Sequence, residues 1–254
     1  MCTDSGVDRA VATQLDGPGR RVLFCLPYAG GGVAVFRGWE EWLPDGVEVC
    51  ALELPGRAPR IGVPPARRME ALVDALIEQI EPLPAMQFAL FGHSMGALVA
   101  FELARAIRAR GFVEPVALFV SAHHAPQFEG ERTALHRLSD VDLRAELRRL
   151  GGTPPELLQN PAFMELLLPT IRADFEVCET YGYVERAPLE CPILAFGGSE
   201  DAQVGEDELR GWSEMTTGCF RLVMLRGGHF FINENRETLL GEMDRCFAPL
   251  RAYR

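Results

Sequence analysis

The sequence predicts an α/β protein: a mostly parallel, doubly wound sheet with an inserted helical lid. Short apolar segments bounded by glycine or proline alternate with stretches of helical periodicity, which is the pattern of repeated β-α-β units. The apolar segments are nearly continuous, as expected of parallel strands that are covered on both faces. The alternation is interrupted over residues 124–185, where helical patterns follow one another without a strand. We therefore expect one core domain with a helical insertion.

The core consists of alternating strands and helices. The expected strands are Arg21–Pro27, Val47–Leu52, Gln87–Phe91, Val116–Ser121, Pro192–Phe196 and Phe220–Leu225. Helical spacing of apolar residues predicts helices over Arg67–Ile80, Met95–Arg110 and Glu234–Phe247. Gly111 follows the second helix at the position where a left-handed glycine ends many helices.

The expected lid contains helices with recognisable starts. The segment Ser139–Leu150 has Asp142 three residues after its first serine, which resembles a capping box. Thr153-Pro154-Pro155 and Asn160-Pro161 each place an N-cap residue before a proline of the first turn. The helix that begins at the latter proline contains Pro169, which predicts a kink. We expect a disordered leader over residues 1–19, a core over 20–123 and 186–254, and a lid over 124–185.

Composition excludes several classes of protein. The 254 residues carry 25 basic and 36 acidic side chains, a net charge of −11, which argues against nucleic acid as a partner. No apolar run is long enough to cross a bilayer, and the first residues lack the apolar region of a secretory signal. The seven cysteines are scattered without a C-x-x-C pair, and we expect them to be reduced and mostly buried. Together these features predict a cytoplasmic protein with no membrane partner, and we expect a monomer.

The strongest local signal is the motif Gly92-His93-Ser94-Met95-Gly96. It has the form G-x-S-x-G and lies between an expected strand and an expected helix, which is the context of a nucleophile elbow. Such a turn lifts a serine hydroxyl clear of the sheet at the positive end of a helix. We expect Ser94 to be a catalytic nucleophile. The alternative is an ordinary N-cap serine in a glycine-rich turn.

A serine nucleophile needs a base and an acid that orients the base, in the chain order Ser, acid, His for this kind of fold. His229 follows the last expected strand and is the only histidine after the lid. Asp201 follows the expected strand Pro192–Phe196, with Glu200 as the alternative acid. The sequence therefore predicts a triad of Ser94, Asp201 and His229.

The oxyanion hole requires two N–H donors. The amide of Met95, directly after the nucleophile, is the first candidate. The second comes from the glycine-rich loop after the first strand, where we expect Ala29, with Tyr28 or Gly30 as alternatives. This loop lacks the G-K-[ST] ending of a phosphate-binding loop, and the chain contains no lysine.

These residues together resemble the stand-alone (type II) thioesterases of polyketide and nonribosomal peptide synthesis. The matching segments are Leu26-Pro27-Tyr28-Ala29-Gly30-Gly31, Glu53-Leu54-Pro55-Gly56-Arg57, Gly92-His93-Ser94-Met95-Gly96, Arg149-Leu150-Gly151-Gly152-Thr153-Pro154-Pro155-Glu156, Leu167-Leu168-Pro169-Thr170-Ile171-Arg172-Ala173-Asp174-Phe175 and Gly227-Gly228-His229-Phe230-Phe231. The resemblance covers roughly residues 20–248. One departure is Asp201-Ala202-Gln203, where the family pattern has Asp followed by Pro or a similar small turn residue.

The resemblance implies an α/β-hydrolase fold and an editing role. Enzymes of this family hydrolyse aberrant or stalled acyl groups from the phosphopantetheine thiol of acyl or peptidyl carrier proteins. No metal or organic cofactor is implied, because the substrate itself carries the phosphopantetheine. We expect Tyr28 and the lid residues Phe163, Leu167 and Phe175 to contact the acyl group, although most apolar lid residues should pack the lid on the core.

Other functions use the same triad. A general acyl-CoA thioesterase, a carboxylesterase and an acyltransferase would share it, and substrate preference separates them. A catalytically inactive interaction module is a more remote alternative. The basic residues Arg57, Arg60, Arg67 and Arg68 suggest a docking patch for an acidic carrier protein, against the alternative of a solvated surface.

Overall fold

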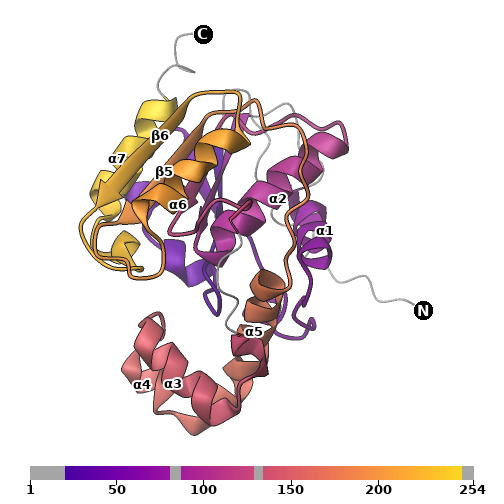
Figure 1. Cartoon of the computed structure of the whole chain (residues 1–254), viewed down its shortest axis with the longest axis vertical. Helices are drawn as coiled ribbons and strands as arrows, with labels where there is room; N and C mark the ends of the chain where they lie inside the picture. Colours follow the sequence, from indigo (N-terminus) through magenta and orange to yellow (C-terminus); the bar gives the residue numbers. More distant parts are fainter. Residues whose placement is uncertain (1–20, 81–86, 129–133, 248–254) are drawn as a thin grey trace.

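The computed structural model describes residues 21–80, 87–128 and 134–247 of the chain (Figure 1). The predicted leader, residues 1–19, lies outside the described residues. Among the described residues, no helix is both long and apolar enough to cross a membrane. The described cysteines are free thiols: Cys25 and Cys191 are buried, Cys50 and Cys178 are partly buried, and Cys219 is exposed, contrary to the expectation of mostly buried cysteines.

A parallel sheet forms the centre of the molecule. Its strands are β1 (Arg21–Leu26), β2 (Val47–Ala51), β3 (Gln87–His93), β4 (Leu118–Ser121), β5 (Ile193–Gly198) and β6 (Phe220–Leu225), in the order β2-β1-β3-β4-β5-β6. Every pair of neighbours in this sheet is parallel, which confirms the predicted class. β5 runs further than predicted because Gly197 and Gly198 pair with the last residues of β6.

Side chains of β1 alternate between two apolar layers, as the pleat of a strand requires. Val22, Phe24 and Leu26 join the larger core cluster, to which α1 (Met69–Ile80) and α2 (Met95–Ala109) contribute. Leu23 and Cys25 point to the other face. There they pack with the 3-10 helix η2 (Val33–Phe36), with Trp39 and Leu43 on either side of the 3-10 helix η3 (Glu40–Trp42), and with α7 (Arg236–Phe247). The sheet is thus covered on both sides, which explains its nearly continuous apolar strands.

Sequence periodicity missed one short helix of the core. α6 (Glu206–Arg210) has an acidic first turn and little apolar pattern, and it continues into the 3-10 helix η5 (Gly211–Met215). Gly111 has a φ of +71° and follows α2 as predicted.

The lid lies between β4 and β5 and consists of α3 (Asp140–Leu150), α4 (Pro155–Leu158) and α5 (Pro161–Glu179). The Oγ of Ser139 accepts from the Asp142 amide, and Oδ1 of Asn160 accepts from the Phe163 amide, so two of the three predicted caps are confirmed. The N-cap of α4 is Pro154 rather than Thr153. α5 is one helix that includes Pro169. Figure 1 shows α3 and α4 at one end of the molecule, with α5 leading back to the sheet.

Candidate active site

The strand order determines where a site can form. β1 lies between β2 and β3 in the sheet, so the chain moves to one side of β1 to form β2 and to the other side to form β3. In doubly wound sheets, ligands bind at the carboxyl ends of the strands at such a switch point. Leu26 and Gly92 are paired near these ends. The loop after β1 and the turn after β3 therefore emerge side by side.

The turn after β3 is strained in the way that a nucleophile elbow requires. Ser94 has φ +54° and ψ −122°, a backbone conformation that costs a non-glycine residue on the order of 1–3 kcal/mol. A Cβ on Gly92 would lie 1.9 Å from the carbonyl oxygen of Gly96, and a Cβ on Gly96 would lie 2.2 Å from that of Leu26. The Ser94 amide donates to the carbonyl of Ser121 at 2.7 Å. Only glycines fit on either side of this serine.

The structure brings the three predicted triad residues together. Nε2 of His229 lies 2.9 Å from Oγ of Ser94, and Nδ1 lies 2.8 Å from Oδ2 of Asp201. The side chain of Asp201 is 1% exposed, so its charge faces the imidazole with little competition from water. Glu200, the alternative acid, is 66% exposed and lies 3.9 Å from Arg226. The geometry selects Asp201.

Backbone contacts hold the acid and the histidine in place. The Glu200 amide donates to the Gly227 carbonyl at 2.9 Å, which ties the loop after β5 to the loop after β6. Oδ1 of Asp201 accepts from the Gln203 amide at 2.8 Å. The unusual Asp-Ala-Gln sequence therefore still forms a turn that orients the carboxylate.

In the glycine-rich loop after β1, the amides of Gly30 and Gly31 both donate hydrogen bonds within the protein. The Gly31 amide donates to the Tyr28 carbonyl at 2.8 Å, which closes a tight turn. Gly30 has a φ of +76°, and its amide donates to Oδ2 of Asp174 at 2.7 Å. Because this amide is occupied, Gly30 is no longer an alternative oxyanion donor, and Ala29 and Tyr28 remain. On the other side, Met95 is the first residue of α2, where helix amides lack partners within the helix.

Two further histidines lie near the triad and are held neutral. His93 is fully buried, and its Nδ1 lies 2.8 Å from Oγ of Ser121. Burial, together with the neighbouring His229, lowers the pKa of His93 well below its ordinary value. Burial and His124 lower the pKa of His123 to about 3. The lowered pKa makes each of these two rings a weak base.

A pocket with about 390 Å³ of empty space, partly open to solvent, is lined in part by Ser94 and His229. Its lining residues are Tyr28, Ala29, Ser94, Leu147, Leu150, Gly152, Thr153, Phe175, Gln203, His229 and Phe230. Of the expected substrate contacts, Tyr28 and Phe175 line it. Phe163 and Leu167 do not line it; they pack against the apolar cluster inside the lid, which Phe175 also contacts.

Sequence reasoning missed several lining residues, although signals for them existed. Leu150, Gly152 and Thr153 lie in a lid segment that matches the family pattern, and Phe230 directly follows the catalytic-site histidine. The lid meets the core closely here, because a Cβ on Gly152 would lie 2.3 Å from the ring of Phe230. For Leu147, helical spacing shows only an apolar face, not which end of it opens to the pocket.

The predicted docking patch of arginines requires a correction. Arg57 is 8% exposed and its Nη2 donates to Oδ1 of Asp174 at 2.6 Å, so it is not part of a surface. Arg67 is exposed and pairs with Glu176 at 2.7 Å. The structure thus removes Arg57 from the predicted patch, while Arg67 and Arg68 are exposed and Arg60 is half-buried.

Comparisons with known proteins agree with this architecture. Residues 21–246 match the family model described as "Thioesterase domain". The chain is 45% identical to the gramicidin S biosynthesis protein GrsT of Aneurinibacillus migulanus over 86% of this chain and 85% of that protein.

Solved structures from NRPS/PKS and related biosynthetic pathways are also similar to this chain. ClbQ from the colibactin NRPS/PKS pathway superposes with a TM-score of 0.87 at 33% identity, covering 92% of this chain and 100% of that one. The type II thioesterase BorB from the borrelidin biosynthetic cluster superposes with a TM-score of 0.83 at 38% identity, covering 91% and 94%. By its sequence, its sheet and its lid, the chain belongs to the thioesterase domain family and, within it, to the type II thioesterases of NRPS/PKS pathways.

Proposed function

We propose that this protein is a serine thioesterase that hydrolyses aberrant or stalled acyl groups from the phosphopantetheine arm of acyl or peptidyl carrier proteins. The observation that carries the proposal is the continuous hydrogen-bonded chain from Ser94 through His229 to Asp201, at the base of a lid-covered pocket. The similarity to type II thioesterases of biosynthetic pathways supports the substrate class.

The acylation step follows from the geometry. Nε2 of His229 accepts the hydroxyl proton of Ser94 while Oγ attacks the thioester carbon. Asp201 accepts from Nδ1–H, which fixes the imidazole tautomer and stabilises the imidazolium. The C–S bond then breaks, and the imidazolium gives its proton to the departing pantetheine thiol.

Deacylation repeats these roles with water. His229 takes a proton from a water molecule, whose oxygen attacks the acyl carbon of the ester on Ser94. The bond to Oγ breaks, Oγ regains a proton from His229, and the carboxylic acid leaves. In both steps we assign stabilisation of the oxyanion to the amides of Met95 and Ala29. A thioester is already an activated acyl donor, so we propose that no cofactor is needed besides the phosphopantetheine of the substrate.

The pocket favours acyl groups of limited size. Tyr28, Phe175, Leu147 and Phe230 offer apolar surface next to the nucleophile. Part of its roughly 390 Å³ of empty space is open solvent, so the enclosed space is smaller than that. We therefore assign the acyl contacts to these residues rather than to Phe163 or Leu167.

The test compares one acyl group, propionyl, on three carriers: a holo carrier protein, CoA and N-acetylcysteamine. The Ser94→Ala variant is the control, and a fluorophosphonate probe should label Ser94 in the parent protein only. We expect faster hydrolysis of the carrier-protein substrate and an inactive variant. Equal or faster hydrolysis of the CoA substrate would indicate a general acyl-CoA thioesterase. Absence of both labelling and hydrolysis would indicate an inactive interaction module.

A further inference from the structure

A helix of the lid makes direct hydrogen bonds to the loop that we assign to the oxyanion hole. Asp174 lies on α5, 144 residues from Gly30, and its Oδ2 accepts from the Gly30 amide at 2.7 Å. Its Oδ1 accepts from Nη2 of Arg57 at 2.6 Å. Nη1 of Arg57 donates to the carbonyl of Gly31 at 2.8 Å. One buried ion pair therefore contacts both glycines of the turn.

These contacts determine the orientation of one peptide group. The turn runs from Tyr28 to Gly31, and the φ of +76° at Gly30 is the value that the third residue of a type II turn adopts. The carboxylate of Asp174 accepts the N–H of the peptide between Ala29 and Gly30. A flip of this peptide would break that bond and turn the Ala29 carbonyl toward a negative charge. The amide of Ala29 belongs to the adjacent peptide, so its direction depends on the same turn.

We propose that Asp174, supported by Arg57, is a positioning residue that holds the oxyanion loop in its active geometry. The inference rests on the proposed function, in which the Ala29 amide binds the oxyanion. The second-strand loop that carries Arg57 and the lid helix that carries Asp174 would thus act on catalysis without touching the substrate.

Because Asp174 and Arg57 are both buried, breaking the ion pair between them would cost free energy. Asp174 is 2% and Arg57 is 8% exposed, so removing either side chain would leave the other charge buried without an oppositely charged partner. Burial raises the pKa of the Asp174 carboxyl, while Arg57 and the Gly30 amide oppose that rise. Arg57 and the Gly30 amide thus favour the charged form of the Asp174 carboxylate.

The part of α5 that carries Asp174 is fixed to the core along its length. Oγ1 of Thr170 donates to the Gly56 carbonyl at 2.6 Å. Ile171 packs on the oxyanion loop so closely that a Cβ on Gly30 would lie 2.8 Å from it. The apolar cluster of α3, α4 and the first half of α5 also includes Ile171, whereas Val177 belongs to the larger core cluster. The residues after Pro169 therefore join the lid cluster to the core.

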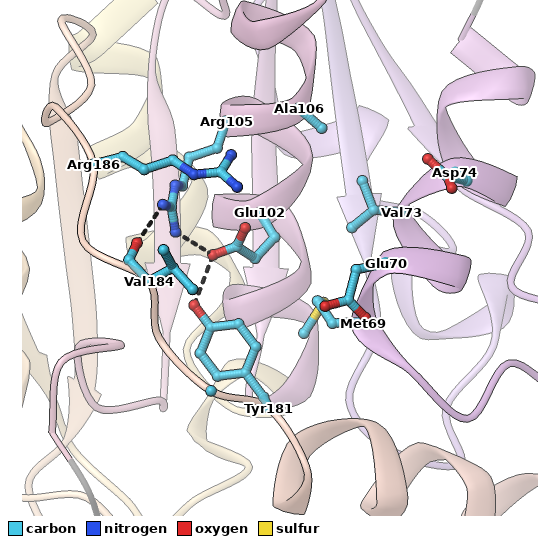
Figure 2. Close-up of a pocket in the computed structure, with 11 residues that line it drawn as sticks. Met69, Glu70, Val73, Asp74, Glu102, Arg105, Ala106, Tyr181, Val184 and Arg186 are labelled. Atoms are coloured by element: carbon cyan, nitrogen blue, oxygen red, sulfur yellow. Dashed lines mark hydrogen bonds and ion pairs between the residues drawn. The ribbon is translucent and has the colours of Figure 1, made fainter.

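A second network holds the chain just beyond α5. Figure 2 shows it beside a pocket of about 620 Å³, partly open to solvent, between α1, α2 and the segment after α5. The hydroxyl of Tyr181 donates to Oε1 of Glu102 at 2.6 Å, and Arg105 donates to Oε1 of Glu102 and to the Val184 carbonyl, each at 2.6 Å. Glu102 and Arg105 lie on α2, the helix that begins after the nucleophile. The same helix thus positions Ser94 and anchors the support of the oxyanion loop.

The test is the Asp174→Asn variant of the full chain, with Glu176→Gln as the matched control. In asparagine an NH2 group replaces one of the two carboxylate oxygens, so a donor then faces either the Gly30 amide or Arg57, and that hydrogen bond is lost. Glu176 lies on the same helix and pairs only with the exposed Arg67 among the ion pairs of the described residues. Both variants are assayed with propionyl-N-acetylcysteamine and with a trifluoromethyl ketone analogue, whose hemiketal adduct on Oγ of Ser94 carries the oxyanion.

We expect Asp174→Asn to lower kcat roughly 10- to 100-fold with KM within about twofold, since misplacing one donor costs less than the 10²- to 10³-fold of removing it. The analogue should lose affinity in parallel, and Glu176→Gln should match the parent. A structural role alone would lower the thermal midpoint but leave kcat and analogue affinity of the folded enzyme unchanged, and this result would overturn the inference.

Two further outcomes keep the inference separate from the proposed function. If Asp174→Asn does not fold, the double variant Arg57→Gln/Asp174→Asn removes both charges together, and parental kcat in its folded form would overturn the inference. If the parent protein neither hydrolyses the thioester nor reacts with a fluorophosphonate, the proposed function itself fails. An active parent with equal kcat in Asp174→Asn and Glu176→Gln refutes only the role of Asp174.

Discussion

Acidification should destabilise this protein through two histidines near the active site. Burial lowers the pKa of His93 well below 6.5 and that of His123 to about 3. In the unfolded chain both would titrate near 6.5. Below that pH the unfolded state therefore binds protons that the native state does not, so stability is complete above about pH 6.5 and is lost as the pH falls.

The size of the destabilisation follows from the difference in histidine pKa between the native and the unfolded state. At pH 5.5 an unfolded histidine is about 90% protonated, while the native rings stay neutral. Each histidine then reduces the free energy of unfolding by about 1.3 kcal/mol between pH 7.0 and pH 5.5. His93 and His123 together account for about 2.5 kcal/mol, which corresponds to a shift of about 1 M in the urea midpoint.

The assay is urea unfolding at both pH values for the parent and for His123→Gln. The variant lacks one titrating ring. Between pH 7.0 and pH 5.5 its free energy of unfolding should therefore fall by about 1.3 kcal/mol less than that of the parent. The difference between two pH values cancels whatever the substitution itself does to packing. Equal losses in the two proteins would show that His123 titrates normally in the native state, and the reasoning from burial would be refuted.

Two further predictions concern the site. Asp201→Asn should lower kcat about 10⁴-fold by favouring the wrong imidazole tautomer, whereas Glu200→Gln, at an exposed neighbour, should leave thioester hydrolysis within about twofold. A comparable loss in both variants would contradict the choice of acid. Gly96→Ala should destabilise the fold by about 3 kcal/mol or more, because its Cβ would lie 2.2 Å from the backbone oxygen of Leu26. Gly62→Ala, which meets no atom within 4 Å, should change the thermal midpoint little, and similar midpoints for the two variants would argue against the elbow geometry.

Features with a local cause could be predicted from the sequence. The elbow around Ser94 follows from two glycines between a strand and a helix, because the backbone of neighbouring segments approaches within contact distance there. His229 and Asp201 follow from chain order, since each comes after a strand and all parallel strands end at the same edge of the sheet. The caps at Ser139 and Asn160 depend on bonds to residues three positions away.

Contacts between distant segments could not be predicted in this way. Arg57 was expected on a surface because neighbouring positions also carry arginine, but the fold buries it against Asp174 of the lid helix. Phe163 and Leu167 were expected in the acyl pocket because they are apolar, but they pack within the lid. Helical periodicity shows that a face is apolar, not which other element covers it.

By itself, the sequence determined the class of the fold, the positions of most strands and helices, and the three residues at the centre of the site. Those features depend on backbone conformation and on the order of elements along the chain. Only the tertiary structure decided which loop amides remain free, which lid residues face the nucleophile and where the charge of Arg57 lies. The reason is physical: hydrogen bonds such as that between Gly30 and Asp174 join segments whose distance in space is set by the packing of the whole domain, and no local pattern encodes it.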